Sequence, residues 1–292
     1  MHLGAHVSIG GGFERAVREA RELGCEAIQI FTGSRMQWRV RDVAPEAARR
    51  FARAIRQAGV GATLVHDSYL INLASPDPAL AARSRAAFLA EIERSARLGI
   101  DALVFHPGAH MGAGEEAGLE RVAAQLESIL DEDRHRVTLL VENTAGQGTT
   151  LGHRLEHLAV LLDAVSRCPG RRRRLGVCID TCHLFAAGYD LRTPRAYAAT
   201  LGEIERVVGL DAVRALHLND SKGGLGSRLD RHAEIGAGAI GARAFGRLVR
   251  DPCWAERPGI LETPGGLEGY RRALCRLRRM RARARPPVRA PG

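Results

Sequence analysis

The chain has 292 residues, of which 45% are hydrophobic and 26% charged, a composition typical of a soluble globular protein with one sizeable core. No apolar run reaches the ~18 residues of a membrane span and no secretory signal is recognisable, so we exclude a membrane protein and expect a cytoplasmic one. The formal net charge of +10 favours a polyanionic partner such as nucleic acid. Because the chain is rich in Arg and Ala and has a single lysine, Lys222, a general compositional bias is an alternative source of this charge.

Six cysteines are scattered along the chain without a CxxC pair, a pattern that predicts reduced thiols and no disulfide framework. They are Cys25, Cys168, Cys178, Cys182, Cys253 and Cys275. The spacing of Cys178 and Cys182 matches no common zinc motif, so packing is favoured over metal ligation for both.

Short apolar runs typical of buried strands alternate with amphipathic, helix-like stretches. In chain order the runs are 2–7, 26–31, 62–65, 102–105, 136–141, 175–179, 213–216 and 259–261. The segments 45–59 and 78–99 carry apolar residues three and four apart, which predicts helices. Pro45 and Pro78 stand near the expected helix starts, and Gly59 near an expected end, as capping prefers.

Eight strand-plus-helix units in a chain somewhat longer than the ~250 residues typical of the fold predict an α/β protein, a single (β/α)8 TIM barrel over residues 1–283. A doubly wound open sheet is the alternative. Both folds use fully buried parallel strands, so the apolar runs do not separate them. We expect residues 284–292, which are basic and Pro-rich, to be a disordered tail.

Potential metal ligands come directly after six of the predicted strands. Closing strands three to eight in order, they are His66, His106, Glu142, Asp180, His217 and Glu262. In a barrel these positions form a ring around the mouth at the carboxyl ends of the strands, whereas an open sheet would spread them along a line. Neighbouring carboxylates repel, so such a ring would be costly without cations. The pattern therefore favours a barrel with a metal centre over a set of separate structural residues.

Two further pairs of potential ligands extend this ring. His183 lies three residues past Asp180, while Asp230 and His232 are one residue apart, a spacing that aims both side chains the same way on an extended segment. We expect the glycine-rich loop 217–232 to fold back and bring Asp230 and His232 beside His183. The alternative is a solvated loop whose glycines only permit turns. Nitrogen and oxygen ligands without thiolate favour zinc, our choice, or manganese or iron over calcium and magnesium.

These motifs together resemble the endonuclease IV family of apurinic/apyrimidinic endonucleases, zinc-dependent enzymes of AP endonuclease family 2. The resemblance runs from about residue 3 to about residue 265. It is carried by GAHVS (4–8), HDSYLINLASP (66–76), FHPGAH (105–110), VENTAGQG (141–148), CIDTCHLFAAGYDLRTP (178–194), HLNDSKGGLGSRLDRHAEIGAG (217–238) and LET (261–263).

The resemblance implies a TIM barrel that holds three zinc ions, with manganese possible at some positions. By resemblance the ligands form three groups: His66 and His106 with Glu142, which bridges to the second group; Asp180, His217 and Glu262; and His183, Asp230 and His232. The third group agrees with the grouping that the spacing gives.

The implied activity is DNA base excision repair by a monomeric hydrolase with no membrane partner. The family cuts duplex DNA on the 5′ side of an abasic site and leaves a 3′-hydroxyl and a 5′ deoxyribose phosphate. This reaction needs a nucleophile at neutral pH, neutralisation of phosphorane charge and help for the departing oxygen, and three metals can divide these tasks. Glu142 and Glu262 are the expected catalytic carboxylates, the first as a bridge and the second also orienting the attacking hydroxide.

The family inserts loop side chains into the duplex and extrudes the abasic nucleotide, which is easier where no base remains to stack. Tyr69 matches its stacking residue, and Gln37 and Trp38 match its inserting loop. The position before Gln37, an arginine in the best-known members, is Met36 here, with Arg35 one residue back. Met36 can fill the vacated stack as an apolar wedge. Loop packing is the alternative, most of all for Trp38.

Two Arg-rich segments stand apart from these motifs. The run 171–174 precedes the sixth strand, so we expect it on the amino-terminal face, as a solvated connection and not as a DNA contact. The segment 271–292 is expected to begin as a helix. Its position relative to DNA is not fixed by the sequence.

Two other functions remain as alternatives. A sugar isomerase or epimerase on the same barrel needs one metal and a subset of the ring, such as Glu142, Asp180, His217 and Glu262. The extra ligands argue against it. A noncatalytic DNA-lesion binder with structural metals is the second alternative, and the complete ligand set argues against that.

Overall fold

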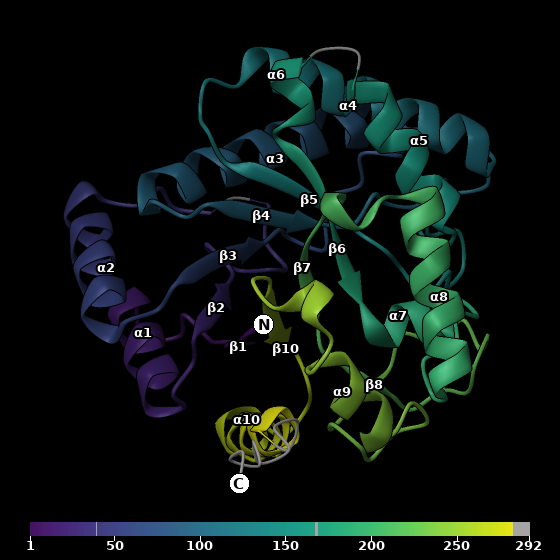
Figure 1. The fold of residues 1–292 in the computed structure, drawn as a ribbon. Coiled ribbons are helices and arrows are strands. Elements are labelled where there is room, and N and C mark those ends of the chain that lie inside the picture. The colour runs from purple at the N-terminus through teal and green to yellow at the C-terminus, as the bar shows by residue number, and fades with distance from the viewer. Residues whose placement is uncertain (39, 167–168, 283–292) are drawn as a thin grey trace, which may run out of the picture.

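A closed barrel of eight parallel strands forms the centre of the molecule in a computed structural model that describes residues 1–38, 40–166 and 169–282 (Figure 1). Around the barrel the order is β1 (His2–His6), β10 (Pro258–Leu261), β7 (Val213–His217), β6 (Leu175–Asp180), β5 (Thr138–Glu142), β4 (Ala102–Phe105), β3 (Ala62–His66) and β2 (Ala27–Ile30). The predicted TIM barrel is confirmed, and the open sheet is excluded. The proposed tail 284–292 and Cys168 lie outside the described residues.

Helices surround the barrel in Figure 1. They are α1 (Phe13–Glu22), α2 (Pro45–Ala58), α3 (Pro78–Leu98), α4 (Glu115–Glu132), α5 (Leu155–Ser166), α6 (Pro169–Arg172), α7 (Thr181–Ala186), α8 (Pro194–Val207), α9 (Ala242–Leu248) and α10 (Gly266–Ala282), with 3-10 turns at Leu210–Ala212 and Pro252–Trp254. Over the described ranges, none of these helices has the length and apolarity that crossing a bilayer requires.

Local sequence signals set the helix ends. The Asp77 side chain accepts hydrogen bonds from the backbone N–H groups of Ala79 and Leu80 at 2.8 and 3.2 Å, and Pro78 occupies the first turn. These contacts satisfy N–H groups that have no partner within the helix. At the other end Gly99 adopts φ 70°, a left-handed conformation that glycine enters without a Cβ clash. The boundaries of α3 therefore follow the prediction closely.

The barrel interior is a separate apolar cluster to which seven strands contribute one residue each. It comprises Ala27, Leu64, Val104, Leu140, Cys178, Ala215 and Ile260. Because side chains alternate along a strand, the residue two positions further on points into the barrel again, nearer its carboxyl mouth. This layer therefore aims the next inward position of every strand at one place.

Four strands, β3, β5, β6 and β7, end one residue later than predicted, whereas β1 and β2 end one residue before the ends of the predicted runs 2–7 and 26–31. His66, Glu142, Asp180 and His217 are the last residues of their strands, whereas His106 and Glu262 follow theirs, as predicted. Backbone pairing explains why β5, β6 and β7 extend to their ligand residues: Glu142 pairs with Cys178, and Asp180 pairs with His217, across neighbouring strands.

A two-stranded antiparallel sheet, β8 (Asp220–Ser221) with β9 (His232–Ala233), was not predicted. It lies within the glycine-rich loop and its extension, and it is the contact that folds this segment back on itself. Two-residue strands produce no periodic pattern in a sequence, which explains why the sheet was missed.

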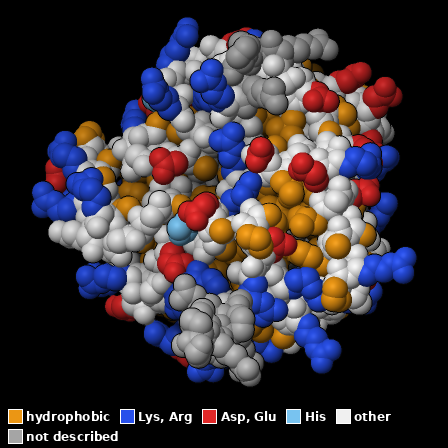
Figure 2. Space-filling view, in the orientation of Figure 1, with side chains coloured by type: hydrophobic (Ala, Val, Ile, Leu, Met, Phe, Trp, Pro, Cys, Tyr) orange, Lys and Arg blue, Asp and Glu red, His pale blue; other side chains and the backbone are white. Residues whose placement is uncertain are grey.

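Positive charge is spread over the face of the molecule that Figure 2 displays. Figure 2 shows blue Lys and Arg side chains around the periphery of the displayed face, interspersed with red acidic ones. Arg171 of the Arg-rich run lies on α6 and pairs with Asp131 through its Nε at 2.7 Å, and Arg174 pairs with Asp133. The run precedes β6, as the sequence indicates. Two of its arginines have acidic partners.

We predict that Gly4→Ala lowers the free energy of unfolding by about 1–3 kcal/mol or more. A Cβ at Gly4 in β1 would lie 1.8 Å from the backbone oxygen of Ala27 in β2, which cannot move without breaking strand pairing. Thermal unfolding measures the effect. Gly202→Ala on α8 is the matched control: it has open space around it and should be neutral or stabilising by about 0.5–1 kcal/mol. Equal melting temperatures for Gly4→Ala and the unmodified chain would contradict this explanation.

Candidate metal centre

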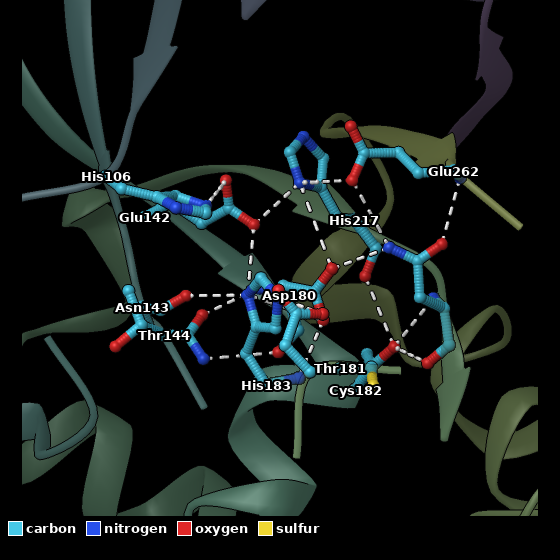
Figure 3. Close-up of polar contacts among 12 residues, drawn as sticks. His106, Glu142, Asn143, Thr144, Asp180, Thr181, Cys182, His183, His217 and Glu262 are labelled. Atoms are coloured by element: carbon cyan, nitrogen blue, oxygen red, sulfur yellow. Dashed lines mark hydrogen bonds and ion pairs between the residues drawn. The ribbon is translucent and has the colours of Figure 1, made fainter. Parts of the chain in front are cut away.

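The ring of polar side chains at the carboxyl mouth follows directly from the inner core. Leu64, Val104, Leu140, Cys178, Ala215 and Ile260 each precede a predicted ligand by two residues. The six ligands therefore point into the mouth from six different strands, and Figure 3 shows five of them converging there. The sequence prediction of a ring is thus what the barrel geometry produces.

Glu142 lies at the centre of this ring and is fully buried. Its Oε2 is 3.1 Å from His66 Nε2 and 3.2 Å from His106 Nε2. Its Oε1 is 2.9 Å from His217 Nδ1 and 3.3 Å from His183 Nδ1. Burial alone would raise the pKa of Glu142, but the imidazoles of His217 and His106 hold that pKa well below its usual range. The carboxylate is therefore ionised, and its two oxygens face different groups of histidines.

All nine residues that the sequence analysis predicted as ligands come together at the mouth. Their ligand atoms form three groups, in each of which the atoms lie within 4.8 Å of one another: His66, His106 and Glu142; Glu142, Asp180, His217 and Glu262; and His183, Asp230 and His232. The first two groups share Glu142. This is the grouping that the family resemblance implies, and the assignment of individual ligands stays a prediction.

Backbone carbonyls orient two of the histidines. His183 Nδ1 donates to Asn143 O at 2.9 Å, and His66 Nδ1 donates to Asp67 O at 3.0 Å. A carbonyl can only accept, so each ring carries a proton on Nδ1, and its Nε2 is the nitrogen that can bind a cation once it is unprotonated.

The third group has the donor set of a cation site. His183 Nε2 and His232 Nε2 are buried and have no hydrogen-bond partner in the part of the chain that the structure describes. Both approach Asp230 Oδ1, at 3.2 and 3.4 Å. Buried polar atoms almost always have partners, and two imidazoles with a carboxylate are common zinc ligands. These residues fit a metal ion.

Two buried cysteines, Cys178 and Cys182, lie near the centre. Cys182 lies near Asp180 and His232, but burial raises the pKa of its thiol to about 12, and its Sγ donates to Arg231 O at 3.7 Å. Cys178 is fully buried in the inner core, and its pKa is raised to about 12 for the same reason. The five cysteines that the structure describes are free thiols. Packing is therefore favoured over ligation, as the sequence indicates.

Two asparagines that the sequence analysis did not single out hold the carboxylate ligands. Asn219 donates to Asp180 Oδ2 at 2.6 Å and accepts from the backbone N–H of Glu262 at 2.9 Å. Asn143 accepts from the backbone N–H of Asp180 at 2.7 Å. Their place in the sequence was a usable signal, because Asn143 follows a ring residue directly and Asn219 follows His217 by two.

Asp220, also missed, anchors the segment that carries Asp230 and His232. Its fully buried carboxylate accepts backbone N–H groups at 2.8–3.4 Å from Ser221, Gly236, Gly238, Ile240 and Gly241. Gly238 packs so closely that a Cβ there would lie 2.5 Å from an Asp220 oxygen. These hydrogen bonds tie the backbone of residues 236–241 to β8, so removing the carboxylate would leave several N–H groups without an acceptor.

A cavity of about 1050 Å³ opens beside the ring, lined by residues that include His66, His183, Asp230, Arg35 and Tyr69. Of the predicted DNA-contacting residues, Met36 is 65% exposed and Tyr69 is 52% exposed. The Ser68 hydroxyl donates to Arg35 O at 2.9 Å and so joins the two loops. Gln37 is exposed on the same loop.

Trp38 differs from these exposed residues. It is only partly exposed, and the guanidinium of Arg83 on α3 lies over its ring at 4.5 Å from the centroid. Loop packing, the alternative interpretation, therefore explains Trp38 without DNA.

A TIM barrel whose carboxyl mouth gathers histidines and carboxylates around a shared buried glutamate has the arrangement that metal-dependent barrel enzymes use. A family model described as a xylose isomerase-like TIM barrel matches residues 17–280. A probable endonuclease 4 of Chloroflexus aurantiacus is 50% identical over 264 residues, covering 90% of this chain and 91% of that protein. One of Halorhodospira halophila is 47% identical over 278 residues, covering 94% and 92%.

Among solved structures, endonuclease IV from Thermus thermophilus superposes with a TM-score of 0.84 at 38% identity, covering 97% of this chain and 100% of that one. The chain belongs to the endonuclease IV family, the second family of AP endonucleases, and is an enzyme of the hydrolase class. A D-tagatose 3-epimerase-like protein is 16% identical with a TM-score of 0.72, covering 96% and 97%, which reflects the shared fold alone.

We predict that Asp220→Asn lowers the free energy of unfolding by about 2–3 kcal/mol, because the amide removes the charge and places N–H donors against N–H donors. Chemical denaturation measures this loss. Asp211→Asn, at an exposed position before β7, is the matched control and should change stability by less than ~0.5 kcal/mol. Equal effects of the two substitutions would show that Asp220 does not anchor the segment.

Proposed function

We propose that the chain is a zinc-dependent DNA repair endonuclease. It hydrolyses the phosphodiester bond on the 5′ side of an abasic site in duplex DNA and leaves a 3′-hydroxyl and a 5′ deoxyribose phosphate. It acts as a monomer in the cytoplasm. Family membership supports the reaction class. The observation that carries the proposal is the convergence of nine potential ligands in three groups, two of them joined through Glu142.

The three groups would hold three zinc ions, with Glu142 bridging the first two. Bound zinc would supply Lewis acidity that makes water nucleophilic near neutral pH and neutralises charge on the phosphate. The residues themselves supply orientation: carbonyls fix His66 and His183, and asparagines fix Asp180 and the backbone of Glu262. An array held in this way loses little energy to reorganisation when charge develops on the phosphate.

Glu262 is placed to orient the attacking water. It borders the cavity, and its Oε2 lies 3.3 Å from His217 Nδ1. Burial would raise its pKa, but His217 and His6 hold that pKa below its usual range, so the side chain is a carboxylate. An ionised carboxylate accepts a hydrogen bond from water and aligns it for attack.

The exposed loops beside the cavity are proposed to recognise the lesion. Tyr69 borders the cavity and is half exposed, and we assign it to stack against an extruded deoxyribose. The Arg35 guanidinium lies over its ring at 5.9 Å from the centroid. Met36 projects from the neighbouring loop and is proposed to enter the duplex as an apolar wedge, with Gln37 beside it.

A single-metal isomerase or epimerase is less well supported. It would use Glu142, Asp180, His217 and Glu262 but would leave the other five residues of the groups without a role. The epimerase-like structures share 14–16% identity with this chain, a level that speaks to the fold only. A noncatalytic lesion binder is disfavoured because every position of the ligand set is filled.

We predict that the protein nicks a duplex carrying a single abasic analogue, and that prolonged chelation abolishes this activity until zinc is restored. Glu262→Gln should lower kcat by at least ~100-fold while sparing most DNA binding, because it removes a carboxylate without emptying the groove. Resolving the labelled strands measures cleavage. Glu256→Gln is the control, because it makes the same change at a residue that precedes β10 in the chain and whose side chain is 89% exposed. Cleavage that survives chelation, or a near-normal Glu262→Gln rate, would contradict the proposed mechanism.

We predict that Met36→Arg tightens binding to an abasic duplex more than to an intact duplex. Only the abasic duplex has a vacated stack in which the added guanidinium finds specific partners. Fluorescence titrations at fixed salt measure both affinities. Val160→Arg adds the same charge at an exposed site on α5 and should change both affinities alike. Unchanged or weaker discrimination by Met36→Arg would refute the wedge role.

A further inference from the structure

Gln29 occupies the ring position of β2. It follows the inner-core residue Ala27 by two positions, as each ring ligand follows its own inner-core residue. The side chain is fully buried, although it is an amide in an otherwise apolar strand. A buried amide is costly unless its donors and acceptor are paired, so the contacts of Gln29 define what it does.

The Gln29 carbonyl holds one proposed ligand. Gln29 Oε1 is 2.9 Å from His217 Nε2, and a carbonyl oxygen can only accept, so His217 donates from Nε2. His217 Nδ1 then faces Glu142 Oε1 at 2.9 Å and Glu262 Oε2 at 3.3 Å. When His217 is neutral with its proton on Nε2, its Nδ1 lone pair points at these two carboxylate oxygens, an arrangement that a bound cation would stabilise.

The NH2 group of the Gln29 amide contacts a second proposed ligand, Glu262. Gln29 Nε2 donates to Glu262 Oε1 at 2.8 Å and lies 3.0 Å from His6 Nδ1, the inward side chain at the end of β1. Glu262 Oε1 is thereby occupied, while Oε2 faces His217. Because a carboxylate only accepts, Glu262 also fixes which end of the amide points toward it.

We propose that Gln29 is a positioning residue that sets the tautomer of His217 and the rotation of the Glu262 carboxylate at the same time. Both side chains belong to the group formed with Glu142 and Asp180. One amide thus presents Nδ1 of the imidazole and Oε2 of the carboxylate to one place. The inference rests on the proposed metal-dependent function, and its magnitude should be that of other residues that hydrogen-bond to metal ligands, about 10–100-fold in metal affinity or activity.

Gln29→Met tests this role because it keeps the approximate length of the side chain and removes both hydrogen-bonding functions. Three quantities are measured: zinc affinity by competition with a chromophoric chelator, the His217 tautomer by nitrogen-15 NMR, and kcat and KM on an abasic duplex. We expect zinc affinity and kcat to fall by about 10–100-fold, KM to stay constant because the DNA-contacting loops are untouched, and the Nε2–H form of His217 to be lost.

Leu64→Met is the matched control, since Leu64 pairs in register with Gln29 and lies in the inner core. It should leave all three quantities unchanged. Gln29→Glu separates the two contacts, because it keeps an oxygen acceptor for His217 but replaces the donor to Glu262 with a repelling carboxylate. It should keep the His217 tautomer and still lose kcat, and it serves as the test if Gln29→Met does not fold.

Wild-type zinc affinity, kcat and His217 tautomer in folded Gln29→Met would overturn the inference and leave the proposed function intact. An unmodified chain that binds zinc but does not cut abasic DNA would contradict the proposed function, and the zinc affinities of the variants would still decide the role of Gln29. An unmodified chain that binds no divalent cation would overturn both.

Discussion

The burial of one carboxylate governs the rest of this structure. Glu142 is fully buried, with imidazole nitrogens of His66, His106, His183 and His217 within 3.3 Å of its oxygens. Moving an ion such as this carboxylate out of water costs several kcal/mol of free energy. Nearby positive charges and hydrogen-bond donors must therefore compensate for the lost hydration. Asp180 at the end of β6 and Glu262 after β10 add two more carboxylates, so still more positive charge is needed at the mouth. The cations that we propose at the mouth would meet this requirement, and metal binding would then be linked to the stability of the fold.

The barrel meets this constraint through alternation along its strands. One apolar layer inside the barrel aims the next inward residue of each strand at the mouth, so ligands far apart in sequence meet without long loops. The third group depends on a longer excursion of the chain, because Asp230 and His232 come from a segment folded back by β8 and β9 and held by Asp220. Structures described as sugar epimerases share the same barrel fold, so what distinguishes this chain is the set of side chains on the ring and loops.

Much of this arrangement could be predicted from the sequence, because eight apolar runs and the polar residue after six of them follow one repeating rule. His6 and Gln29 hold the same ring position in β1 and β2 and were missed, because both lie inside the predicted runs 2–7 and 26–31 and not directly after them. Asn219 and Asp220 were missed because their partners are backbone groups and side chains that only the folded chain brings near. Long-range pairing of that kind leaves no periodic trace.

Anomalous diffraction recorded on both sides of the zinc absorption edge tests the central claim most directly. Crystals of the protein purified with zinc should give three peaks, one within ligand distance of each group, with Glu142 between the first two. A single peak, or none beside Glu142, would show that protons and not metal ions compensate the buried carboxylate. The account of a trinuclear nuclease would then be wrong.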